Sequence, residues 1–318
     1  MGIAIEVGFV AITSDEYHSN KEAVGHSALV KILTSPAHFN EAQINPPEPS
    51  AAMELGTAFH AALLEPDVFA AKYAVIEEAK LAGALVSLDD YKAAAATLGI
   101  TVGKMRKDEL RAAIQAQNDP RFKFREDVMA DLYGGKSILS AGDMSAVRAM
   151  AASLMAHRGA AGLLAKGMAE MSGFWVDQET GIMCKFRPDW IAQDAEGRYI
   201  GMVDAKKARS ASKDAFQRAI TNFGYDVQAA FYTDGMKALT GRTVPFYFAP
   251  VEDAAPYAAA VYKASDEMIA HGRAKYRAAL QLLKWCRENG SWPSYQPFGE
   301  IEEIDPPRWD SFNTEAEA

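Results

Sequence analysis

The 318-residue sequence predicts a mixed fold of the α/β or α+β class. Between residues 171 and 208, three runs rich in β-branched and aromatic residues are separated by turn-forming residues at 179–181 and 194–197, as expected for consecutive strands. Stretches with apolar residues at helical spacing lie before and after these runs. This order of helix, three strands, helix and strand belongs to the mixed class.

The N-terminal part is predicted to be mainly helical after a short extended piece. The segment GHSALVKILTSPAHF has apolar residues at helical spacing, and a helix from Met53 to Leu64 ends at Pro66. The composition of residues 79–118 is rich in alanine, lysine and aspartate, and two glycines interrupt the segment. This pattern favours an inserted helix–turn–helix unit. A further helix is predicted over residues 141–157.

The C-terminal part begins with the three strand-like runs MSGFWVD, IMCKFRPDWIA and RYIGMVDAK. Two helices over residues 212–223 and 225–239 are divided by Gly224, and the runs TVPFYFAPVE and PYAAAVYKA predict two more strands. A long amphipathic helix covers residues 265–288. We therefore divide the chain into an N-terminal helical part, a helical insert, a core with the strand hairpin and an acidic tail, at residues 1–80, 81–118, 119–298 and 299–318.

Composition narrows the class of protein. The formal net charge is −9, but residues 299–318 hold seven acids and one arginine, so the rest of the chain is nearly neutral and can still carry a basic groove. Two cysteines, Cys184 and Cys286, are too few for a disulfide framework, a four-cysteine zinc site or an iron–sulfur cluster. With no membrane-length apolar run and no signal-peptide pattern, we expect a soluble cytoplasmic protein without membrane partners.

The strand-like run YIGMVDAKK places an acid and a base on one face. Asp204 and Lys206 are two residues apart, so their side chains point to the same side of a strand. A hairpin centred between Glu196 and Gly197 would set Asp189 directly opposite Asp204, with Cβ atoms only ~5 Å apart; a bulge at Pro188 would shift this register by one. Two facing carboxylates favour a bound cation of the Mg²⁺ or Mn²⁺ type. A surface Asp–Lys pair at a strand end is the alternative.

These residues resemble a known family. RPDWI followed by VDAKKARSAS resembles the PD-(D/E)xK nuclease superfamily, and the closer resemblance is to RecE-type, exodeoxyribonuclease VIII-like exonucleases of phages and prophages. SALVKILTSPAHF, GTAFHAALLEPDVF, FGYDVQAAFYTDGM and WPSYQPFGEIEEIDPPRW match further family segments in order, over roughly two thirds of the chain. The resemblance implies a restriction-endonuclease-like core, with a central mixed sheet flanked by helices and a helical insert added.

The resemblance also implies roles for individual residues. It makes Asp189, Asp204, the Ala205 carbonyl and His60 ligands of Mg²⁺, with Mn²⁺ as a possible substitute. Lys206 becomes the catalytic lysine. Gln228 and Tyr232, four apart on one helical face, match a Q-x-x-x-Y feature near the active site. Without the resemblance, His60 would be read as a packed or surface histidine, and the glutamine–tyrosine pair as part of an ordinary amphipathic helix. This chain departs from the family in carrying lysine, not the common threonine, at position 207.

The implied activity is Mg²⁺-dependent exonucleolytic digestion of linear double-stranded DNA from 5′ ends. It would leave 3′ single-stranded tails for a strand-annealing protein during phage-type recombination, in a bacterial host cell. The resemblance further suggests a ring-like homo-oligomer. It leaves open whether one or two metal ions take part.

DNA binding needs positive charge, and two segments can supply it. Residues 201–218 carry a net charge of +3, and we expect phosphate contacts from Lys207, Arg209, Ser210 and Lys213. In the insert, residues 87–117 resemble SAP-like helix–extended loop–helix units of DNA-binding proteins; there the basic residues that would face phosphate are Lys104, Arg106, Lys107 and Arg111. A solvated helix face and a spacer hairpin are equally compatible with these two patterns.

Three other functions compete with the exonuclease. A structure-specific or restriction-like endonuclease on the same fold would cleave closed circles. A catalytically inactive fold acting as a DNA-binding module would have no need of a buried acid pair. A metal site acting on a small phosphorylated molecule is disfavoured, because the chain has no G-x-x-x-x-G-K-[ST] loop.

Overall fold

The computed structural model describes residues 6–48, 50–296 and 301–305. A five-stranded mixed sheet forms its centre, in the order β10-β9-β8-β7-β4, with β8 and β9 parallel and the other pairs antiparallel. Its strands are β4 (Gly167–Ala169), β7 (Trp190–Gln193), β8 (Tyr199–Ala208), β9 (Phe246–Glu252) and β10 (Tyr262–Lys263). The mixed α/β class is confirmed.

Two smaller sheets accompany the central one. An antiparallel sheet in the order β1-β5-β6 contains β1 (Gly8–Val10), β5 (Ser172–Val176) and β6 (Met183–Phe186). A parallel pair joins β2 (Tyr73–Ala74) to β3 (Ser137–Ile138). The run IMCKFRPDWIA, predicted to be one strand, is therefore two strands in different sheets, with Arg187, Pro188 and Asp189 between them.

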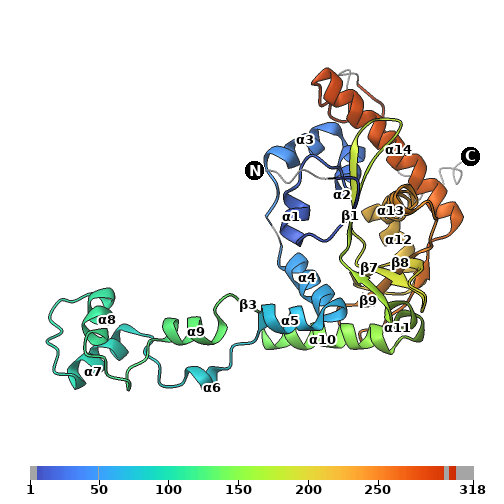
Figure 1. Cartoon of the computed structure of the whole chain (residues 1–318). Helices are drawn as coiled ribbons and strands as arrows, with labels where there is room; N and C mark the ends of the chain where they lie inside the picture. The colour runs from blue at the N-terminus through green and yellow to red at the C-terminus, as the bar shows by residue number, and fades with distance from the viewer. Residues whose placement is uncertain (1–5, 49, 297–300, 306–318) are drawn as a thin grey trace, which may run out of the picture.

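Helices cover both faces of the central sheet (Figure 1). On one face lie α4 (Ala51–Leu64) and α10 (Ala141–Ala156), and on the other α2 (His26–Thr34), α13 (Tyr225–Thr240) and α14 (Asp266–Asn289). The remaining helices of the body are α1 (Ser14–Ser19), α3 (Pro36–Ile44), α5 (Pro66–Lys72), α11 (Arg158–Leu164) and α12 (Lys213–Phe223). Within the described residues, none of the helices combines the length and apolar content needed to cross a bilayer.

Strand β8 separates two hydrophobic cores because its side chains alternate between the faces of the sheet. Met202 packs into the core formed with α13 and α14, whereas Val203 and Ala205 pack into the core formed with α4 and α10. Asp204 follows the alternation and lies on the Met202 face, where it is 2% exposed. Because both faces of β8 are buried, the alternation fixes the direction of the Asp204 and Lys206 side chains.

The predicted hairpin register, which sets Asp189 opposite Asp204, is correct. Trp190 pairs with Val203 and Ile191 with Met202, so continuing the ladder by one residue sets Asp189 opposite Asp204. The irregularity lies between Ala192 and Gln193, near the turn, and not at Pro188.

Helices α13 and α14 approach each other closely at a glycine. A Cβ atom on Gly272 of α14 would lie 1.9 Å from the Asp226 carbonyl oxygen of α13. Asp226 also pairs with Lys275 and His271 of α14, at 2.8 Å each. At the start of α13, Gly224 adopts φ 65°, which lets α12 end and α13 begin within one residue. These features set the position of α13, the helix that carries Gln228 and Tyr232.

The insert projects away from the body (Figure 1). Its helices α7 (Leu88–Thr97) and α8 (Lys107–Gln115) enclose a small core of their own, made of Leu85, Tyr91, Ala94, Ala95, Leu110, Ile114 and Phe124. Two helices, α6 (Glu78–Leu81) and α9 (Arg125–Tyr133), lead to and from the body. The two ends of the insert meet where the Leu85 N–H donates to the Lys123 carbonyl (2.7 Å) and the Arg125 N–H to the Leu85 carbonyl (3.1 Å).

Candidate active site

Asp204 and Lys206 form the centre of the site, side by side on β8. Lys206 Nζ lies 2.5 Å from Asp204 Oδ2, and the Gln228 amide donates a 2.5 Å hydrogen bond to Asp204 Oδ1. Asp204 Oδ2 is buried, and within the described part of the chain it accepts no hydrogen bond of good geometry. Burial lowers the pKa of Lys206, but the charges of Asp204 and Asp189 outweigh it and raise the pKa overall. Lys206 is therefore a cation in this site.

Asp189 is held by the backbone of the neighbouring strand. The Ala205 N–H donates a 2.6 Å hydrogen bond to Asp189 Oδ2, and Asp189 Oδ1 lies 3.5 Å from His60 Nδ1. The pKa of Asp189 is raised to about 7, mainly by burial; His60 opposes the rise, and the charge of Asp204 contributes to it. The two acids thus lie opposite each other but contact different partners: Asp189 contacts His60, and Asp204 contacts Lys206.

His60 reaches the same point from α4, on the other side of the sheet from α13. Its Nε2 lies 3.0 Å from the Ala205 carbonyl oxygen, and its side chain is 30% exposed. The four groups that the resemblance implies as metal ligands are therefore gathered at one end of β8, namely His60, Asp189, Asp204 and the Ala205 carbonyl.

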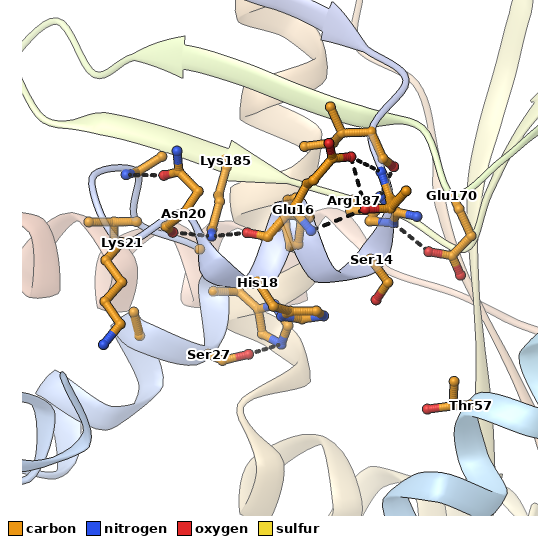
Figure 2. Close-up of a pocket in the computed structure, with 18 of the residues that line it drawn as sticks. Ser14, Glu16, His18, Asn20, Lys21, Ser27, Thr57, Glu170, Lys185 and Arg187 are labelled. Carbon is orange, nitrogen blue, oxygen red and sulfur yellow. Dashed lines mark hydrogen bonds and ion pairs between the residues drawn. The ribbon is translucent and has the colours of Figure 1, made fainter. Parts of the chain in front are cut away.

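Glu170 is a further acid of this site, and sequence reasoning missed it. His60, Glu170 and Asp189 each offer a donor atom within 4.8 Å of the others, a set that suits a metal ion. Arg187 Nε holds Glu170 Oε2 at 2.6 Å (Figure 2), and the Glu170 N–H donates to the Asp189 carbonyl at 3.0 Å. The Glu170 backbone has φ 51°, a conformation that non-glycine residues rarely adopt and that recurs at functional sites.

Gln228 and Tyr232 connect the site to the N-terminal part of the chain. Both are nearly fully buried on one face of α13. Tyr232 Oη lies 3.3 Å from His26 Nδ1 on α2. Burial raises the pKa of Tyr232 well above its ordinary value, with the charges of Tyr17, Asp204 and Asp189 adding and the Gln228 amide opposing. Tyr232 is thus a neutral hydroxyl, close to both the Gln228 amide and His26.

The basic residues expected to contact DNA lie in varied surroundings. Lys207 pairs with Asp253 at 3.4 Å, Arg209 and Lys213 are exposed, and Ser210 donates to Ser212 at 3.1 Å.

In the insert, Lys104 is exposed, and the three other basic residues face acids of the insert and of α9. Arg106 lies 3.3 Å from Asp108, Lys107 lies 3.7 Å from Glu126, and Arg111 pairs with Glu126 and Asp127.

A cleft of about 1130 Å³ opens over the site. Its floor is formed by the candidate site residues, namely His60, Glu170, Asp189, Asp204, Lys206, Gln228 and Tyr232. One wall is formed by α1, α2 and α3, and the side chains of Ser27 and Thr57 face the cleft (Figure 2). Lys185 and Arg187 anchor that wall. Lys185 Nζ donates to the Tyr17 and Asn20 carbonyls at 2.6 and 2.7 Å, and Arg187 donates to the Ile12 carbonyl at 2.8 Å. The N-terminal segment is thereby part of the cleft.

Comparisons with known proteins agree with this geometry. The family described as "PDDEXK-like domain of unknown function (DUF3799)" matches residues 25–305. The chain belongs to this family. No curated protein matches the sequence. The family's description places the chain in the PD-(D/E)xK nuclease superfamily, and a solved structure shares its fold.

That solved structure is the crystal structure of the "putative exonuclease" of Eubacterium rectale. It is similar at a TM-score of 0.53 and 12% sequence identity, over 94% of this chain and 97% of that chain. At this identity the likeness shows a shared fold.

The site fits a divalent cation. Its donors are carboxylate and carbonyl oxygens with one imidazole, the set that Mg²⁺ and Mn²⁺ accept. Among the described residues, the buried Gln228 Oε1 has no hydrogen-bond donor, a state that is costly unless a cation or water satisfies it. The residues present therefore match the metal that the fold implies.

Proposed function

We propose that the protein is a Mg²⁺-dependent exodeoxyribonuclease that digests linear double-stranded DNA, in the 5′ to 3′ direction. The observation that carries the proposal is the single cleft in which His60, Asp189, Asp204 and Lys206 converge. Such a convergence of acids with a partly buried lysine is expected for phosphodiester hydrolysis.

His60, Asp189, Asp204 and the Ala205 carbonyl would hold Mg²⁺, with Glu170 beside them; Mn²⁺ is a possible substitute. A bound Mg²⁺ would polarise the scissile phosphate and lower the pKa of an attacking water.

The protein's own groups then have distinct tasks. Lys206 keeps its proton, so it can donate hydrogen bonds to the water and to the charge that grows on the phosphate oxygens. The Gln228 amide donates a 2.5 Å hydrogen bond to Asp204 Oδ1, which fixes the orientation of this carboxylate beside Lys206. Asp189 is fixed in turn by the Ala205 N–H.

The direction of digestion and the biological role rest on the resemblance to RecE-type exonucleases. We propose that the products are 3′ single-stranded tails, passed to a single-strand annealing protein during phage-type recombination. A ring-like homo-oligomer around the DNA would suit such digestion.

The decisive test uses two DNA substrates and two lysine variants. Wild-type protein, Lys206→Ala and Lys237→Ala are incubated with 5′-labelled linear duplex and with closed circular plasmid, with and without Mg²⁺. Lys237→Ala is the matched control, because that exposed lysine of α13 is not among the residues that line the cleft. We expect Mg²⁺-dependent release of 5′-labelled mononucleotides from linear DNA, abolished in Lys206→Ala and kept in Lys237→Ala.

Other outcomes would change the assignment. Nicked or linearised circles would indicate an endonuclease. DNA retardation in a gel without any cleavage in Mg²⁺ or Mn²⁺ would indicate a DNA-binding module that has lost activity.

A further inference from the structure

His26 lies at the point where the N-terminal wall of the cleft touches the active-site helix. Its ring stands edge-on to Tyr232, with centroids 5.6 Å apart and an interplanar angle of 81°. The His26 Nδ1 faces the Tyr232 hydroxyl at 3.3 Å, and the other ring nitrogen, Nε2, faces Ser27 Oγ at 3.5 Å. Ser27 is exposed and His26 partly so, and both line the cleft that holds Asp204 and Lys206.

We assign the ring proton of His26 from the groups around it. Tyr232 is a neutral hydroxyl that faces His26 Nδ1, and we assign Tyr232 as the donor in this contact. If Nδ1 accepts, a neutral imidazole carries its proton on Nε2. Burial and the charge of Lys206 both lower the pKa of His26, which keeps the ring neutral. The buried tyrosine thus directs a ring N–H toward the cleft.

The Ser27 contact leaves this N–H available to a better acceptor. A separation of 3.5 Å is at the outer limit of a hydrogen bond, so the serine holds the imidazole N–H weakly. An anionic phosphate oxygen is a stronger acceptor than a hydroxyl. His26 and Lys206 line the same cleft, so a phosphate bound beside His26 would lie in the same cleft as the scissile one.

We propose that His26 binds a phosphate of the DNA strand in the cleft, through Nε2–H, and that Tyr232 sets the tautomer that makes this possible. The proposal rests on the proposed nuclease function and adds a specific contact to it. It also gives the glutamine–tyrosine pair of α13 two separate tasks. Gln228 positions the Asp204 carboxylate, and Tyr232 orients a residue that binds the substrate.

Two substitutions separate the ring nitrogens. In His26→Asn, the short amide overlies Nδ1 and keeps an acceptor for Tyr232, but the donor at Nε2 is gone. In His26→Gln, the longer amide reaches the position of Nε2 and restores a donor. The matched control is His38→Asn, because His38 also uses Nδ1 to contact a serine, Ser35 at 2.6 Å, but lies on α3 outside the residues that line the cleft.

DNA binding is measured without turnover, by placing each substitution in the Lys206→Ala protein. Fluorescence anisotropy with a short labelled duplex gives the dissociation constant, and thermal melting and Mn²⁺ titration report on fold and metal site. Loss of a hydrogen bond to a charged group predicts roughly tenfold or greater weakening of DNA binding for His26→Asn. We expect His26→Gln to recover at least part of this loss, and His38→Asn, melting and Mn²⁺ affinity to stay unchanged.

In the otherwise wild-type enzyme, His26→Asn should raise KM for DNA far more than it lowers kcat. Unchanged DNA binding in His26→Asn would overturn the proposal, as would an equal loss in His26→Gln and His26→Asn. These outcomes are distinct from a failure of the proposed function, which would appear as wild-type protein that cleaves no DNA.

Discussion

The Ala205 N–H donates a 2.6 Å hydrogen bond to Asp189 Oδ2, so the strand that carries Asp204 and Lys206 also holds the acid opposite them. The amide of one residue therefore fixes Asp189, while its carbonyl faces His60 at 3.0 Å. A single peptide segment ties the strand hairpin to α4. The positions of Asp189 and Asp204 relative to each other consequently depend on the register of β7 against β8.

Asp189→Asn should separate the structural role of this residue from its charge. The asparagine oxygen can still accept from the Ala205 N–H, so we expect a melting temperature close to that of wild type. Cleavage should fall by at least 100-fold, because the site loses a negative ligand. Asp189→Ala would in addition leave the buried N–H without an acceptor and destabilise the protein by roughly 1–3 kcal/mol. Parallel cleavage assays and denaturant titrations measure both effects, and equal stability of the two variants would contradict the assignment.

Glu170→Gln should weaken metal binding while the fold is retained. The glutamine oxygen can still accept from Arg187, but the charge beside His60 and Asp189 is lost. We expect about 10–100-fold weaker Mn²⁺ binding by calorimetry, and a matching loss of cleavage at low metal concentration. Asp234→Asn is the control, since Asp234 pairs with Arg273 at 2.7 Å on α13 and α14. That variant should change stability but leave Mn²⁺ affinity alone, and a Glu170→Gln protein with normal affinity would remove Glu170 from the metal site.

Replacing Lys206 with methionine should make stability depend more strongly on metal. Asp204 would then be a buried carboxylate without its cation, so the metal-free variant should unfold more easily than wild type. Adding Mg²⁺ supplies the missing positive charge, and we expect it to raise the melting temperature of Lys206→Met by more than that of wild type. A thermal scan with and without Mg²⁺ tests this, with EDTA as the metal-free reference. Equal shifts in the two proteins would mean that the cation does not approach Asp204.

His26 predicts a specific dependence of stability on pH. Burial, with the charge of Lys206, lowers its pKa to about 4 in the folded protein, while Asp204 opposes this and His18 adds to it. The unfolded chain takes up the proton near the ordinary pKa of about 6.5. Between these values the unfolded state binds more protons, so stability falls as pH decreases from 6.5 to 4, by up to about 3 kcal/mol. Denaturant titrations of wild type and His26→Asn over this range isolate the effect, because the carboxyl groups titrate in both; parallel curves would show that His26 does not contribute.

Removing the insert should leave the nuclease body intact. Residues 85 and 125 are joined by backbone hydrogen bonds, and the core of the insert is separate from the two cores of the sheet. A variant with residues 86–123 replaced by a short glycine–serine link should therefore melt near the wild-type temperature and cleave short duplexes at the wild-type rate. If the insert contacts DNA, the variant should bind long duplexes more weakly, and Lys104→Glu in the full chain should show part of this loss. Loss of folding in the deletion would contradict the separation of the cores.

Much of the site follows from local pattern because sheet geometry is periodic. A turn at residues 194–197 and the alternation of side chains are enough to place Asp189 opposite Asp204 and to align Lys206 with Asp204. The division of β6 from β7 could not be predicted, because the chain shows one continuous apolar run on both sides of Arg187 and Pro188. Its two ends join different sheets only in the tertiary structure.

Long-range contacts set the limit of sequence reasoning. Strand β4 is Gly-Met-Ala, which has no strand signal, so the position of Glu170 beside Asp189 became visible only through the pairing of β4 with β7. His60 contacts the Ala205 carbonyl across 145 residues of sequence, and no local pattern specifies such a distance. Only the resemblance to a family indicated that His60 belongs to the site.

The close approach of α14 to α13 at Gly272 has a practical consequence for variant screening. Any side chain there would collide with the Asp226 backbone, which cannot move aside as a flexible side chain could, so α13 would be displaced. The displacement would move Gln228 and Tyr232 together. In a saturation mutagenesis experiment scored by activity, Gly272 should therefore be as intolerant as a metal ligand, although it has no chemistry of its own. A selection for active enzymes would therefore preserve Gly272, although this residue takes no part in the reaction.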